Sequence, residues 1–186
     1  MIKKILIIFL LLVMFLCPAY RKPYKSVVDA ERDAFLHNNI GLNYLKDKLY
    51  YAAIQEFKIA ISLSPSSQAS AIFKNNLGNT YMFMNYPDLA KPCFEESVEL
   101  YNLNFQYYLD LVNCYKKLQI LESKIDEFKS SKDLYERILL GLMYLEIKEF
   151  KLGINILDEI VIKEPNLLIT PAIKKYINDT ICKINS

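Results

Sequence analysis

Ile40-Gly41-Leu42-Asn43-Tyr44 is followed along the chain by Leu77-Gly78-Asn79-Thr80-Tyr81 and by Leu140-Gly141-Leu142-Met143-Tyr144. An aliphatic residue, a glycine and, three positions later, a tyrosine therefore occur three times in 186 residues. Glycine inside a helix costs about 1 kcal/mol relative to alanine. Its repeated use among residues of helical spacing predicts that a second helix approaches closely at each glycine.

The residues of that second helix follow each stretch, with small side chains seven positions apart. They are Ala53, Phe57, Ala60 and Pro65 after the first stretch, Ala90, Phe94 and Ser97 after the second, and Gly153, Leu157, Ile160 and Pro165 after the third. The sequence thus predicts helix pairs in which a small residue of one helix faces the glycine of the other.

This arrangement resembles the tetratricopeptide repeat family, in which L-G-x-x-Y, A-x-x-x-F and proline recur about every 34 residues. The units expected from the resemblance are 34–67, 71–104, 105–133 and 134–167. The third is degenerate, with Val112 at the glycine position and Lys124 at the small-residue position. The resemblance implies an all-α, right-handed solenoid of about four helix pairs. In such a solenoid the repeated tyrosines, Tyr44, Tyr81, Tyr115 and Tyr144, are expected to pack in the core.

Local signals refine the unit boundaries. Asp133-Leu134-Tyr135-Glu136 is a capping-box pattern that opens the fourth unit. Three extra residues, 68–70, are expected in the loop between units one and two, and Pro92 is expected to kink its helix. Within residues 168–186, apolar side chains recur at helical spacing after Thr170 and Pro171. This amphipathic pattern predicts a helix that caps the open end of the stack.

The resemblance implies a concave groove, lined by the first helix of each unit, that binds a peptide segment of a partner protein. The expected groove residues are Asn38, Asn39, Leu42, Ile72, Asn75, Asn76, Asn79, Phe83 and Asn113, with Phe35, Leu109, Asp110, Lys117, Tyr135, Ile138, Leu139 and Leu142 beside them. An asparagine amide both donates and accepts, so a row of them suits the backbone of an extended peptide. The alternative is that a chain rich in asparagine simply places these residues on solvated faces.

Charge and composition exclude several function classes. Lys3 and Lys4 lie in the first nineteen residues, which hold no acid, so 21 basic residues face 21 acidic ones in the remainder. This neutrality argues against nucleic-acid binding. The only histidine is His37, and the cysteines Cys17, Cys93, Cys114 and Cys182 form no C-x-x-C pair. We therefore expect no catalysis, cofactor, metal site or small-molecule substrate, and we interpret the later cysteines as small helix residues in preference to a disulfide framework.

The residue types required for one function known in this family are missing from this chain. Chaperone-binding members of the family hold a C-terminal carboxylate with lysine and arginine side chains. The corresponding positions here are Asn38, Leu42, Asn76, Gln106 and Asp110, none of which is basic. The remaining hypotheses are a peptide-binding scaffold that uses the groove, and a structural or assembly component that uses its convex surface or self-association.

The N-terminal residues 1–19 carry the pattern of a targeting segment: a basic start, an apolar run of 13 residues from Ile5 to Cys17, and then Pro18 and Ala19. Residues 20–33 are expected to be a linker and lead-in helix. Three outcomes are open for 1–19: a retained membrane anchor, a cleaved export signal, or lipidation of Cys17 in a loose lipobox. We expect a membrane-associated or exported protein of the cell envelope whose repeats lie outside the cytoplasm, although the charges on the two sides of the apolar run do not determine an orientation.

Overall fold

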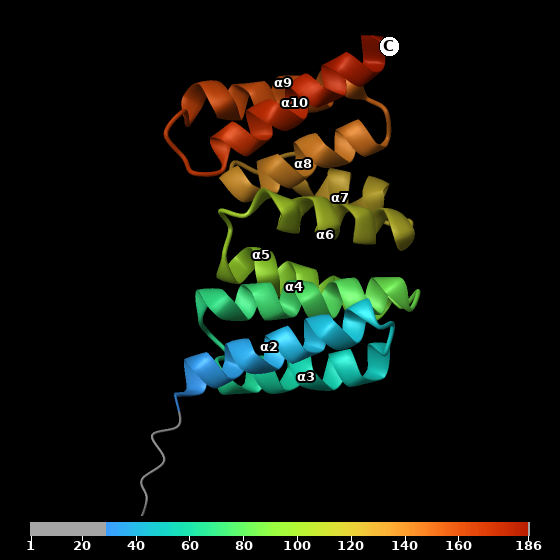
Figure 1. The fold of residues 1–186 in the computed structure, drawn as a ribbon. Helices are drawn as coiled ribbons and strands as arrows, with labels where there is room; N and C mark the ends of the chain where they lie inside the picture. Colours follow the sequence, from blue (N-terminus) through green and yellow to red (C-terminus); the bar gives the residue numbers. More distant parts are fainter. Residues whose placement is uncertain (1–28, 186) are drawn as a thin grey trace, which may run out of the picture.

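The computed structural model describes residues 29–185 and is helical throughout that range (Figure 1). The helices pair in chain order and stack from α2 and α3 at one end to α9 and α10 at the other (Figure 1). Their bounds are α2 Ala30–Lys46, α3 Tyr50–Leu63, α4 Gln68–Phe83, α5 Pro87–Leu100, α6 Phe105–Lys117, α7 Leu121–Phe128, α8 Leu134–Glu146, α9 Phe150–Lys163 and α10 Thr170–Asn185. The predicted all-α solenoid is confirmed. Segment 1–19 and Cys17 lie outside the described residues.

All four units share one turn between their two helices. The residues at its centre, Lys48, Asn85, Gln119 and Lys148, have φ between 59° and 67°. The next N–H always donates to the carbonyl of the repeated tyrosine, as from Leu49 to Tyr44 (2.8 Å) and from Ile120 to Tyr115 (3.1 Å). This left-handed helix end satisfies carbonyls that the helix leaves unpaired. Its presence after Tyr115 shows that the third unit keeps the backbone geometry of the others although it lacks the glycine.

The glycines lie where the two helices of a unit cross. A Cβ added to Gly41 would stand 2.7 Å from Cε1 of Phe57, and one added to Gly78 would stand 2.7 Å from Cε1 of Phe94. Gly141 has the same relation to Cγ of Leu157, at 2.7 Å. The side chains that face the glycines, and the alanines beside them, are fully buried: Ala53, Phe57, Ala60, Ala90, Phe94 and Leu157. Pro65 and Pro165 are exposed and follow directly on the ends of α3 and α9.

Two local predictions differ from the structure. Residues 68–70 are the first turn of α4 and not a loop, because the Ser67 hydroxyl accepts a hydrogen bond from the Ser70 N–H (3.1 Å) and caps the helix there. Asp133 does cap α8, since its Oδ1 accepts from the N–H groups of Tyr135 and Glu136. Its own N–H donates to Ser131 Oγ (3.0 Å), so Glu136 does not close the predicted capping box.

Helix α10 covers the inner face of the fourth unit. Its Ile173 and Ile177 are buried in the same cluster as Ile138, Leu139 and Leu142 of α8. Its Tyr176 reaches past α8 to α6, where its ring packs edge-on against Phe105 with centroids 5.4 Å apart. The prediction that Ile138, Leu139 and Leu142 face an open groove is therefore wrong. Ile138 and Leu142 are buried in the core that α10 shares, and Leu139 lies toward residues of α5, α6 and α7. Within residues 29–185, no helix combines the length and apolar character that crossing a bilayer requires.

Candidate functional site: the concave face of α2, α4 and α6

The first helices of units one to three present the predicted groove residues side by side. Their side chains differ in accessibility. Asn39, Leu42, Ile72, Phe83 and Asn113 are exposed, and Asn76 and Asn79 are half-buried, whereas Asn38 (4% exposed) and Asn75 (7% exposed) are buried. The structure thus separates the asparagines into an outer set that solvent reaches and an inner set between the helices.

The inner asparagines belong to two separate hydrogen-bonded groups, which together form the amide network that joins the three helices. Asn76 Nδ2 donates to Asn38 Oδ1 at 2.8 Å and so joins α4 to α2. Asn75 Nδ2 donates to Asp110 Oδ2 at 3.0 Å and joins α4 to α6. Asn79 Nδ2 lies 3.1 Å from Asn75 Oδ1 and 3.4 Å from Asp110 Oδ2. Leaving a buried amide without a hydrogen-bond partner costs more free energy than the hydrogen bond contributes when it forms. Buried amides with such partners therefore fix the register of neighbouring helices.

Asp110 is the acceptor on which this network converges. Besides Asn75 and Asn79, the Gln106 amide donates to it, with Nε2 2.8 Å from Oδ1. Sequence reasoning placed Asp110 in the groove but did not anticipate its three amide donors. The i, i+4 spacing of Gln106 and Asp110 was the available signal for one of them.

A cavity of mixed polar and apolar lining opens at the end of the same face where α2, α4 and α6 begin. It encloses about 390 Å³ and is lined by Phe35 and Ile72 together with Glu31, Gln68, Ala69, Tyr101, Asn104 and Tyr107. Phe35 is held edge-on against the buried ring of Phe73, with centroids 5.3 Å apart. At the opposite end of α4, Phe83 stacks on Tyr50 at 6.5 Å. Both ends of the face therefore offer aromatic surface fixed by a second ring.

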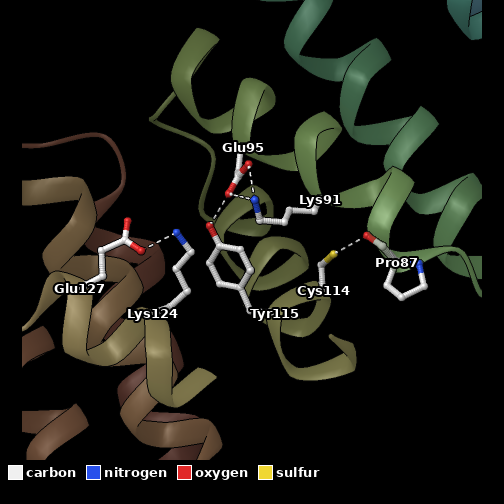
Figure 2. Close-up of polar contacts among 7 residues, drawn as sticks. All are labelled: Pro87, Lys91, Glu95, Cys114, Tyr115, Lys124 and Glu127. Carbon is white, nitrogen blue, oxygen red and sulfur yellow. Dashed lines mark hydrogen bonds and ion pairs between the residues drawn. The ribbon is translucent and has the colours of Figure 1, made fainter. Parts of the chain in front are cut away.

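The convex side has a different construction, shown in Figure 2. Tyr115 of α6 donates its hydroxyl to Glu95 of α5 (2.9 Å), which also pairs with Lys91 (Figure 2). Lys124 of α7 bonds Glu127 and lies over the rings of Tyr115 and Phe128, 5.6 and 5.4 Å from their centroids. Burial and the neighbouring Glu95 carboxylate raise the pKa of Tyr115, so its hydroxyl stays a hydrogen-bond donor at neutral pH. These contacts attach the short helix α7 to the rest of the stack.

His37 and Glu96 are both engaged in contacts with oppositely charged or hydrogen-bonding side chains. His37 Nδ1 lies 2.6 Å from Glu56 Oε2, and Glu96 pairs with Lys74. Among residues 29–185 no group of acidic, histidine and cysteine side chains is arranged to hold a metal ion.

The cysteines of this range are free thiols. Burial raises the pKa of Cys93 to about 11 and that of Cys114 to about 12. A thiol must ionise to act as a nucleophile, so Cys93 and Cys114 are inert at neutral pH. They act as small helix residues, and the Cys114 Sγ donates to the Pro87 carbonyl at 3.3 Å.

Comparison with known proteins identifies the repeat. Residues 72–102 match a family model described as a tetratricopeptide repeat. The chain is 29% identical over 103 residues to the anaphase-promoting complex subunit CDC16 of Saccharomyces cerevisiae. That match covers 53% of this chain but only 12% of the yeast protein.

Two solved structures have a similar fold. The pilF protein of Pseudomonas aeruginosa superposes with a TM-score of 0.50 at 17% identity, covering 80% of this chain and 68% of that one. A tetratricopeptide repeat protein from Parabacteroides merdae gives 0.51 at 11% identity, covering 83% and 62%. The family model thus identifies one tetratricopeptide repeat within residues 72–102, and these two structures show that the helical-repeat fold is shared.

Proposed function

We propose that this protein is a non-catalytic scaffold that binds an extended peptide segment of a partner protein along the concave face of α2, α4 and α6. One observation carries the proposal: this face combines accessible apolar side chains of α2 and α4 with amide groups of α2, α4 and α6. Leu42, Ile72 and Phe83 are exposed there, between the asparagines of the network. Exposed aliphatic and aromatic side chains beside fixed polar groups are typical of a peptide site.

The outer asparagines are the groups that would bind the peptide backbone. Within residues 29–185, the side chains of Asn39 and Asn113 make no hydrogen bond, and Asn76 and Asn79 use only their Nδ2 groups. Their free oxygens can accept from the N–H groups of an extended chain. Since the inner network holds Asn76 and Asn79 in place, binding would cost little side-chain entropy.

Helix α10 limits the length of this site. It covers the inner face of α8, so an incoming segment can lie across α2, α4 and α6 but not across the fourth unit. We accordingly assign the peptide site to the first three units, and the fourth unit with its terminal helix to closing the hydrophobic core.

A double substitution to glutamine tests the site. Leu42→Gln with Ile72→Gln removes the apolar contacts without adding charge, and we expect the affinity for a groove-binding peptide to fall at least tenfold. The expectation rests on burial of a Leu or Ile side chain contributing about 1.5 to 3 kcal/mol and on both residues being partly covered already. Nonapeptides selected from a random phage-displayed library on the full chain would supply the probe, with affinity measured by fluorescence anisotropy.

The matched control is Leu152→Gln with Ile162→Gln, two exposed residues of α9 outside this face. The control should bind like the parent. If the control pair weakens binding and the groove pair does not, the exterior surface carries the interaction and the protein acts as an assembly component instead.

We further propose that residues 1–19 direct the protein to the cell envelope, with the repeats outside the cytoplasm. The support is the basic start and unbroken apolar run from Ile5 to Cys17. Intact-mass measurement on protein from its native host is expected to show either loss of the first residues, a lipid on Cys17, or an unmodified chain in the membrane fraction. An unmodified chain starting at Met1 in the soluble cytosolic fraction would refute the proposal.

A further inference from the structure

Among residues 29–185, Asp110 has no counter-ion, and it lies at the centre of the concave face. Its carboxylate is half-buried and accepts only from the neutral amides of Asn75, Asn79 and Gln106. The ion pairs among residues 29–185 do not include it. Other carboxylates of this range, such as the exposed Asp126, also lack an ion pair, but Asp110 differs from Asp126 in being half-buried and held by three amide donors.

The amides orient this charge without cancelling it. Three N–H donors hold both carboxylate oxygens in one position, so binding a cation costs little additional side-chain entropy. A carboxylate that is partly shielded from water also interacts more strongly with a cation than one on an open surface. Glu31, at the cavity beside Phe35 and Ile72, adds a second carboxylate to the same face.

We propose that the groove selects peptide segments carrying a lysine or arginine, whose side chain pairs with Asp110. The proposal rests on the peptide-binding function above and specifies the partner's chemistry. It reverses the charge of the carboxylate-clamp arrangement, because a basic residue of the ligand meets an acidic residue of the protein. The basic residue would lie opposite α6, with the flanking apolar residues of the peptide over Leu42 and Ile72.

Selection from a random nonapeptide phage library on the full chain, in mild detergent, tests this directly. We expect the groove-dependent clones, defined as those lost on the Leu42→Gln, Ile72→Gln pair, to share a lysine or arginine at one position. Asp110→Asn removes the charge and keeps most of the shape. It should lower their affinity about tenfold, because a hydrogen bond between two charged groups is replaced by one to a neutral amide. Raising NaCl should weaken binding to the parent but not to this variant.

Asp126→Asn, which removes an exposed charge from α7, is the matched control and should change neither affinity nor salt dependence. Because Asp110→Asn also disturbs the amide network, the peptide supplies a second test. Replacing its basic residue by glutamine should cost the parent protein about tenfold and the Asp110→Asn protein almost nothing.

Four results would overturn the inference, and they fall into two distinguishable groups. If the groove-dependent clones carry no shared basic residue, or if the glutamine peptide binds the parent as well as the original does, the groove binds peptides but Asp110 does not select them. If the library yields only clones insensitive to Leu42→Gln, Ile72→Gln, or yields none, peptide binding in the groove itself is wrong.

Discussion

Gly153→Ala is expected to lower the free energy of unfolding by about 3 kcal/mol, the upper end of the usual cost of overpacking a core. A Cβ at this position would stand 2.6 Å from Cδ2 of Leu145 and 2.8 Å from the carbonyl oxygen of Gly141. The oxygen belongs to the backbone of α8 and cannot turn aside as a side chain can. Helices α8 and α9 would have to separate, although alanine favours an isolated helix by about 1 kcal/mol over glycine. Urea unfolding followed by circular dichroism measures the change.

Gly41→Ala is the control for this prediction. The three atoms nearest to its added Cβ are ring atoms of Phe57, the closest at 2.7 Å, and a ring can shift where a carbonyl cannot. We expect Gly41→Ala to cost clearly less than Gly153→Ala. A Gly153→Ala protein as stable as the parent would show that the two helices do not approach as closely as the structure has them.

The repeat architecture was predictable because local sequence patterns determine it. Gly41, Gly78 and Gly141 mark helix crossings, and the tyrosine three positions after each marks the carbonyl that closes the next turn. Tyr115 identified the third unit even without its glycine. Each of these signals lies within one unit, so it can be recognised in the sequence without knowing how the units pack together.

The features that the sequence did not predict depend on contacts between units. Spacing placed Asn38 and Asn75 on the groove face, but it cannot distinguish an amide in water from one bonded to the next helix. Likewise, Ile138 and Leu142 have the spacing of groove residues, and only the path of α10 makes them core. The angle between successive units decides both cases, and no short motif encodes it.

Ile173→Asp is expected to have the largest effect of any single change considered, a loss of about 5 kcal/mol or more. Ile173 is fully buried in the cluster that joins α10 to α8. Truncating a buried isoleucine costs about 2 to 5 kcal/mol, and a carboxylate in an apolar site adds a desolvation penalty. Ile184→Asp makes the same exchange at a position of α10 that is 45% exposed, and it should change stability little.

The loss from Ile173→Asp should be local, because each unit of a solenoid contacts only its neighbours. Hydrogen exchange is therefore expected to accelerate in α8, α9 and α10 while the amides of α2 to α5 keep their protection. Equal loss of protection along the whole chain would mean that the stack unfolds as a single unit. Retention of protection in α8 would mean that α10 does not cover its inner face. In that case the peptide site would extend over the fourth unit, and the boundary drawn at α6 would be wrong.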